Sequence, residues 1–261
     1  MASVLERIVA ETRVAVEARK AAVPIGELCE RARTRTQRSN FASALTQPGV
    51  GFVAEVKRGS PSRGLFAPDL SPGNLARIYC DMGAVAVSVL TSPAFFATDQ
   101  DLCEAADSLA GSGVPLLRKE FHVDAYQVAE AAALGADAYL LIAKTLDADE
   151  LTSLSRAGEK FGLIPFVEVT DEAETEMALS AGAAAIGINN RNLHTFEEDL
   201  STTERLRDLI PPSVPVVAAS GVRTRDDMKR MEACGVNAVL IGEALSSAED
   251  PHAKARELLG R

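Results

Sequence analysis

Residues 53–57 read Val-Ala-Glu-Val-Lys, an apolar run that ends in two ionisable side chains. In five further runs, apolar residues lead to a side chain or glycine that can move a proton or hold an anion: 116–119, 166–168, 186–189, 216–220 and 239–242. Continuous Val, Ile and Leu runs are typical of buried parallel strands. In a closed (β/α)₈ barrel, the carboxyl ends of all strands open on one face. The pattern therefore predicts that these run ends meet in a single pocket.

The segments between the runs have the features of helices. A glycine precedes four of the runs, at Gly83, Gly135, Gly182 and Gly235, and glycine just past a helix accepts the left-handed backbone that other residues resist. We expect strands near residues 51–57, 84–90, 114–119, 137–143, 163–168, 184–189, 214–219 and 237–242. Alternating strands and helices require parallel strands with right-handed crossovers. Eight strands favour a closed TIM barrel, with a doubly wound sheet as the alternative.

Residues 1–50 precede the first strand and do not fit this repeat. We predict a helical extension there, with helices over 3–22 and 26–33, joined to the barrel of residues 51–261 in one domain. The first helix is amphipathic, with apolar positions at Val4, Ile8, Val14 and Val16. A basic cluster follows it, at Arg31, Arg33, Arg35 and Arg38. This cluster is either a solvated stretch or the source of an arginine that leans over the barrel mouth towards an anion.

Composition restricts the partners and the compartment. The 261 residues are 47% hydrophobic, enough for a substantial core, and carry a net charge of −10. Nucleic acid is excluded as a partner because phosphate neutralisation needs a basic face. Four scattered cysteines without metal-ligand spacing indicate reduced thiols, and the chain shows neither a signal peptide nor a membrane-spanning run. We expect a cytoplasmic protein, a monomer or weak homodimer, that acts on a small molecule.

Strand parity predicts which side chains face the pocket. Side chains alternate between the two faces of a strand, so Glu55 and Lys57 share the face of Val53, and Lys119 shares that of Leu117. The same rule places Glu168 inside the barrel with Phe166. The plainer alternatives are an ordinary Glu55–Lys57 ion pair and a surface lysine at position 119. Opposed charges in one pocket can shift the pKa values of acids and bases towards catalytic use.

The last two run ends predict an anion site. Ser220-Gly221 and Gly242-Glu243 lie where barrels commonly bind phosphate through backbone N–H groups. Glycine allows the phosphate to approach closely. The carboxylate of Glu243 would repel a phosphate, so we expect its side chain to turn away.

Five segments in order along the chain closely resemble the signatures of the indole-3-glycerol phosphate synthase family. They are A-E-V-K-R-G-S-P-S-R-G (54–64), L-L-R-K-E-F (116–121), V-E-V (167–169), G-I-N-N-R-N-L (187–193) and S-G-V (220–222). The resemblance runs from about residue 3 to the end of the chain, and the first segment is its most specific part. The family has a (β/α)₈ barrel with an N-terminal helical extension.

The resemblance implies ring closure of 1-(2-carboxyphenylamino)-1-deoxyribulose 5-phosphate, with loss of carbon dioxide and water, and no metal or organic cofactor. Lys119 would be the general acid, Glu168 the general base and Lys57 the group that orients substrate anions. The remaining assignments are Glu55 and Asn189 at the hydroxyls, Ser60, Phe95 and Phe121 at the anthranilate ring, Arg191 in support, and Ser220, Gly221, Gly242 and Glu243 at the phosphate.

Two positions depart from the family pattern. Ala219 stands where the family usually has glutamate, and Ser92 where it usually has an acidic residue. Loss of these carboxylates predicts reduced activity.

Two other functions compete with the lyase. One is an aldolase-like enzyme in which Lys119 or Lys57 forms a Schiff base, which needs a lysine with a lowered pKa. The other is a diverged paralogue that binds a phosphorylated sugar without turnover. The histidines favour none of these, because His122, His194 and His252 have no metal or triad spacing, and we expect His122 to be structural.

Overall fold

The structure is a computed structural model and describes residues 3–34, 38–192 and 195–260. Within these ranges, eight strands close into a barrel in the order β1-β10-β9-β8-β7-β6-β5-β4, and every neighbouring pair is parallel. They are β1 (Gly51–Val56), β4 (Ala86–Leu90), β5 (Leu116–Lys119), β6 (Ala138–Ile142), β7 (Ile164–Val169), β8 (Ala185–Asn189), β9 (Val216–Ala219) and β10 (Ala238–Ile241). The predicted barrel and its eight strand positions are confirmed, and the doubly wound alternative is wrong.

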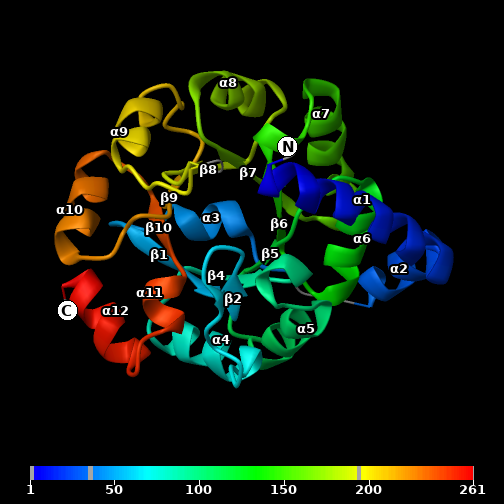
Figure 1. Ribbon diagram of the computed structural model, residues 1–261, viewed down its shortest axis with the longest axis horizontal. Helices are drawn as coiled ribbons and strands as arrows, with labels where there is room; N and C mark the ends of the chain where they lie inside the picture. The colour runs from blue at the N-terminus through cyan, green and yellow to red at the C-terminus, as the bar shows by residue number, and fades with distance from the viewer. Residues whose placement is uncertain (1–2, 35–37, 193–194, 261) are drawn as a thin grey trace.

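Helices surround the barrel as an outer ring (Figure 1). They are α4 (Pro72–Asp81), α5 (Asp99–Ser108), α6 (Ala125–Leu134), α7 (Ala148–Ala157), α8 (Glu172–Ser180), α9 (Ser201–Arg207), α10 (Arg225–Ala233), α11 (Glu243–Ser246) and α12 (Pro251–Leu259), with short 3₁₀ turns η1 (Pro93–Phe95), η2 (Ala143–Thr145) and η3 (Glu159–Phe161). The four predicted helix-stop glycines all have positive φ, between 72° and 106°. Their left-handed backbone is the conformation that the sequence pattern required.

The N-terminal extension wraps the barrel from its mouth to its floor. Helix α1 (Val4–Ala22) contacts α6 and η2, α2 (Ile25–Arg33) packs along α6, and α3 (Phe41–Leu45) lies at the centre of the ring (Figure 1). Helix α1 buries Ile8 and Val16, but Val14 is 74% exposed, so the expectation that it belongs to the apolar face is wrong. Two residues apart on a helix are about 200° apart around its axis, which turns Val14 away from the face of Val16.

The described arginines of the basic cluster do not reach the mouth. Arg31 and Arg33 pair with Glu27 and Glu30 on their own helix. Arg38 donates a hydrogen bond to the carbonyl oxygen of Ala136, before β6 begins, and therefore at the floor. Arg35 lies outside the described residues. Arg31 and Arg33 are solvated, as the first interpretation expected, whereas Arg38 is half-buried and has a structural role that neither interpretation named.

A short hairpin after β1 is among the elements that were not predicted. Strands β2 (Gly59–Ser60) and β3 (Gly64–Leu65) form an antiparallel hairpin between β1 and α4. Two-residue strands are too short to show an alternating pattern. The hairpin carries Ser60 beside the carboxyl end of β1.

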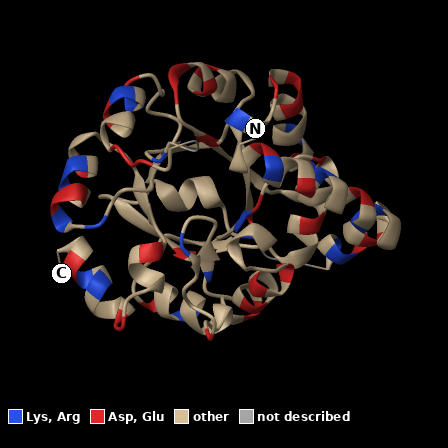
Figure 2. Ribbon diagram, in the orientation of Figure 1, with Lys and Arg blue, Asp and Glu red and all other residues tan. Residues whose placement is uncertain are grey.

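Two apolar layers hold the barrel and confirm the parity prediction. Val53, Leu117, Phe166 and Val217 belong to the cluster that fills the barrel, whereas Val56 and its outward-facing counterparts pack against the helices. Phe41 and Leu45 of α3 join the inner cluster and close the floor. In Figure 2 the central helix carries no charge, whereas the outer helices carry many. The charged side chains inside the barrel therefore lie at the other end, where the strands have their carboxyl ends.

Candidate active site

The carboxyl ends of the strands surround two adjoining cavities, of about 150 and 240 Å³. The first is lined by ten of the predicted site residues: Glu55, Lys57, Ser60, Phe95, Lys119, Phe121, Glu168, Asn189, Arg191 and Ser220. The second adds Gly221, Gly242 and Glu243. The structure therefore brings all thirteen residues to one mouth, where Lys57 and Glu55 border both cavities.

An ion pair at the mouth joins the carboxyl ends of β5 and β7. Lys119 Nζ lies 3.2 Å from Glu168 Oε2, and the side-chain amide of Asn189 donates a 2.9 Å hydrogen bond to Glu168 Oε1. Both carboxylate oxygens thus have donors. Burial lowers the pKa of Lys119, but the carboxylates of Glu168 and Glu55 outweigh it, so the pKa lies above its ordinary value. Lys119 is consequently a protonated acid at neutral pH.

A second pair lies across the mouth on β1 and the residue after it. Lys57 Nζ is 3.8 Å from Glu55 Oε1. Glu55 is buried, and its carboxylate occupies the space that a Cβ on Gly242 would need, so any larger residue at 242 would collide with it. We expected glycine here for close approach of a phosphate. The structure gives it an additional role, because it makes room for the Glu55 carboxylate.

Aromatic rings form one wall of the first cavity. The rings of Phe95 and Phe121 have centroids 6.3 Å apart and are inclined at 31°. Lys57 Nζ lies 5.5 Å from the centre of the Phe95 ring. The hydroxyl of Ser60, on the hairpin, accepts a hydrogen bond from the backbone N–H of Arg63. This wall suits a flat aromatic group that carries a negative charge near its edge.

The second cavity is polar and exposes backbone in a restricted conformation. Ser220 has φ = 65°, which is rare for a residue with a side chain, and Gly221 follows at 82°. At the other side of this cavity, Glu243 forms an ion pair with Arg63 of the β2–β3 hairpin. The side chain that we expected to turn away from an anion is thus neutralised by an arginine.

Arg191 is held from behind by a residue that sequence reasoning missed. Its guanidinium pairs with Glu198, which also pairs with Arg223, and its backbone N–H donates to Asn189 Oδ1 at 3.0 Å.

Helix α1 also lines the first cavity, with Val4, Leu5 and Ile8. Apolar helix residues look like ordinary core in a sequence, so no signal marked them.

The remaining residues that the sequence singled out lie in different places. Ala219 lines the first cavity, whereas Ser92 is buried and its carbonyl oxygen accepts hydrogen bonds from Phe95 and Ala97. His122 is buried with Nδ1 2.7 Å from the carbonyl oxygen of Leu140, which confirms a structural role. His194 lies outside the described residues. Among those that are described, no group of His, Cys, Asp or Glu side chains is arranged to hold a metal ion, and no helix is both long and apolar enough to cross a membrane.

Comparison with known proteins gives consistent matches. A sequence model described as indole-3-glycerol phosphate synthase matches residues 5–258. A Dehalococcoides mccartyi protein of that name is 45% identical over 258 residues, which are 98% of this chain and 100% of that protein. One from Mycolicibacterium smegmatis is 42% identical and covers 99% of this chain and 94% of its own. A solved structure of a mutant tryptophan synthase α-subunit from Pyrococcus furiosus has a TM-score of 0.64 at 16% identity, covering 82% of this chain and 99% of that one, and shows the fold alone.

Proposed function

This chain belongs to the indole-3-glycerol phosphate synthase family, and on that premise we propose how its side chains carry out the ring closure, a decarboxylating step of tryptophan biosynthesis. The substrate is 1-(2-carboxyphenylamino)-1-deoxyribulose 5-phosphate. Its aromatic carbon must attack a ribulose carbonyl, lose carbon dioxide, and lose water to give indole-3-glycerol phosphate.

Lys119 is the general acid of the first step. As the ring carbon attacks, Lys119 gives its proton to the carbonyl oxygen, which becomes a hydroxyl, and the carboxyl group then leaves as carbon dioxide. Glu168 is the general base that takes the proton whose loss completes the new aromatic ring. Lys57 protonates the departing hydroxyl, which leaves as water, while Glu55 and Asn189 hold the sugar hydroxyls.

One observation carries this assignment: the 3.2 Å pair between Lys119 and Glu168 borders the cavity that also contains the Phe95 and Phe121 rings. A general acid and a general base must reach one substrate at the same time. The aromatic wall is positioned to hold the anthranilate ring, with Ser60 beside it and Lys57 near its carboxylate.

The phosphate belongs in the polar cavity. We assign it to the backbone N–H groups of Ser220, Gly221, Gly242 and Glu243, because the left-handed backbone at 220 and 221 exposes such groups. Arg191, fixed by Glu198, supports the junction of the two cavities.

The test is Lys119→Met, assayed by the fluorescence of the indole product. We expect turnover to fall by at least about a thousandfold while the fold is retained. Lys144→Met is the matched control, because Lys144 also follows a barrel strand and pairs with a glutamate, Glu174 at 3.5 Å, yet does not border either cavity. Wild-type turnover in Lys119→Met would refute the acid assignment.

The Schiff-base alternative is disfavoured at Lys119. A nucleophilic lysine needs a lowered pKa, whereas the pKa of Lys119 is raised. Borohydride reduction with a carbonyl substrate is therefore expected to leave the protein unmodified, and a trapped adduct would favour the aldolase.

We further propose that residues 1–50 and the barrel form one domain, since α1 lines the catalytic cavity and α3 closes the floor. A cytoplasmic monomer or weak homodimer remains the expected form. Sedimentation of the purified protein tests the oligomeric state.

A further inference from the structure

Strand β5 carries a buried charge on the face opposite Lys119. Arg118 points outward, into the layer between barrel and helices, and is 1% exposed. Neighbouring positions of this layer are apolar, such as Val89 and Leu116. A buried ion pair is often no more stabilising than an apolar replacement. A guanidinium at this position therefore calls for an explanation other than stability.

Arg118 ties together elements that surround the end of β5. Its Nη2 lies 2.7 Å from Asp99 at the start of α5, and its Nη1 donates to the carbonyl oxygen of Gln127 in α6 at 3.0 Å. Nη1 also lies 3.5 Å from Glu130, whose other oxygen is 2.8 Å from Arg19 of α1. Burial lowers the pKa of Arg118, but the surrounding carboxylates raise it overall, so the charge is permanent.

A fourth contact of Arg118 leads back to the catalytic strand. Its Nε donates to the hydroxyl of Thr91 at 3.3 Å, and that hydroxyl donates to Glu120 Oε2 at 3.0 Å. Thr91 follows Leu90, which pairs with Lys119 in the β4–β5 register. Arg118 and Glu120, which flank Lys119 in the sequence, therefore both bond the hydroxyl of Thr91, the residue that follows the adjacent strand β4.

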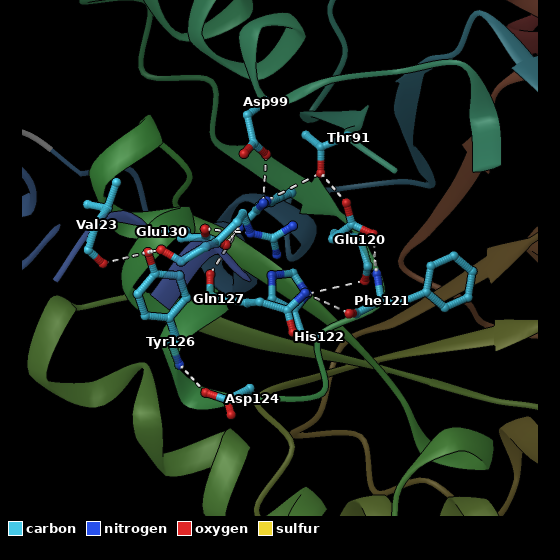
Figure 3. A network of polar contacts seen from close by, with 12 residues as sticks. Val23, Thr91, Asp99, Glu120, Phe121, His122, Asp124, Tyr126, Gln127 and Glu130 are labelled. Atoms are coloured by element: carbon cyan, nitrogen blue, oxygen red, sulfur yellow. Dashed lines mark hydrogen bonds and ion pairs between the residues drawn. The ribbon is translucent and has the colours of Figure 1, made fainter. Parts of the chain in front are cut away.

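The chain after Lys119 is fixed by the same network (Figure 3). Glu120 Oε1 accepts the backbone N–H of Phe121 at 2.8 Å. The side chain of Gln127 donates to the carbonyl oxygen of Phe121 and accepts from the N–H of Val123, each at 2.8 Å. In Figure 3 the Phe121 ring points away from these polar groups. The network thus holds the backbone while leaving the inward side chains free to meet a substrate.

We propose that Arg118, Thr91 and Glu120 form a positioning clamp that sets the place of the Lys119 ammonium between Glu168 and the substrate carbonyl. This inference rests on the proposed role of Lys119 as the acid. None of the three clamp residues reacts, and each acts through the backbone on either side of Lys119. Displacing a catalytic group by about 1 Å can cost about a hundredfold in rate.

The test is Thr91→Val, which removes the shared hydroxyl but no charge and almost no volume. We expect kcat to fall about tenfold to a hundredfold, because the acid is misplaced, and KM to change by less than about twofold, because the binding groups remain. The matched control is Thr175→Val, since Thr175 of α8 is also buried and its hydroxyl donates a hydrogen bond to the carbonyl oxygen of Asp171, which precedes that helix. We expect wild-type kcat and KM in the control.

The folded fraction of each variant, measured by circular dichroism, guards against a purely structural effect. Unchanged kcat in Thr91→Val, or a fall in kcat that disappears once the folded fraction is counted, would overturn the clamp. Arg118→Lys retains the charge but not the forked contacts, and we expect it to reproduce the kcat loss of Thr91→Val. An inactive Lys119→Met beside a normal Thr91→Val would refute the clamp alone, whereas an active Lys119→Met would refute the proposed acid and the clamp with it.

Discussion

The floor and the mouth of the barrel are built from the same strands but differ in chemistry. At the floor, Phe166 of β7 fills the space beside Gly187 and contacts the Phe41 ring edge-on, with centroids 5.5 Å apart. Two residues further along the same strand and on the same face, Glu168 receives hydrogen bonds from Lys119 and Asn189. Both residues face the lumen. A residue's position along the strand, and not the face on which it lies, therefore decides whether it packs in the core or lies at the site of the chemistry. Substitutions at the two ends should therefore have opposite consequences.

The largest expected effect is at the mouth, in Glu168→Gln. Loss of the base lowers kcat about a hundredfold to ten-thousandfold, while the amide keeps the volume and an acceptor for Asn189. Product fluorescence measures kcat, and urea unfolding measures the free energy of unfolding. The contrast between mouth and floor would be wrong if Glu168→Gln lowered the free energy of unfolding as much as the floor variant Phe166→Ala does.

At the floor, Phe166→Ala is expected to lower the free energy of unfolding by about 3–5 kcal/mol, because a fully buried ring is removed. Its kcat, assayed well below the unfolding temperature, should stay close to that of the wild type. A large loss of kcat in the folded protein would show that the floor shapes the chemistry.

His122 sharpens the comparison, because it follows the catalytic strand yet is buried in the polar network behind it. Burial and the nearby Arg118 lower its pKa from 6.5 to about 3. Between these values the unfolded chain binds a proton that the folded chain does not, so stability is complete above pH 6.5 and falls as the pH drops towards 3.

We therefore expect the wild type to lose about 2 kcal/mol more than His122→Asn between pH 7.5 and pH 5, measured by urea unfolding. Parallel pH dependences in the two proteins would show that His122 is protonated in the folded state.

A smaller gain is expected from Ala219→Glu. Ala219 pairs with Asn189 in the β8–β9 register and lines the cavity, at a position where the family resemblance leads us to expect a carboxylate. Restoring it should raise kcat severalfold without changing the unfolding midpoint. Ala218→Ser, on the outward face, serves as the control at the mouth, and no gain in Ala219→Glu would mean that the remaining carboxylates suffice.

The smallest effect concerns the partly exposed Arg63–Glu243 pair. Arg63→Ala should raise KM about twofold to fivefold, since exposed pairs contribute little and Glu243 would then repel the phosphate. Adding Glu243→Gln should return KM to the wild-type value. If the double variant binds no better than Arg63→Ala, the arginine contacts the phosphate itself.

Much of the fold could be predicted because its signals are local. Apolar runs identified all eight strands, and glycines such as Gly135 located helix ends through a backbone requirement of their own. Helix α3 and the β2–β3 hairpin escaped because five and two residues carry no readable period. Val14 was misassigned because an apolar residue near an apolar face need not lie on it.

The inward residues of the site could also be predicted, since parity placed Glu55, Lys119 and Glu168 on the inner face and the closed barrel brought them to one pocket. What sequence reasoning could not find depends on contacts between distant segments. The Arg19–Glu130 pair joins residues 111 positions apart in the sequence, and nothing near Glu198 suggested that it holds Arg191. Pairings of this kind exist only once the chain has folded.

The contact between Gly242 and the Glu55 carboxylate has an evolutionary consequence. We expect alanine at 242 to displace the carboxylate while Glu55 is present, whereas a smaller residue at position 55 would leave room for the added methyl group. We therefore expect the two sites to be epistatic, although their positions in the sequence differ by 187. The order in which substitutions arise, and not only their identity, decides which descendants of this barrel remain accessible.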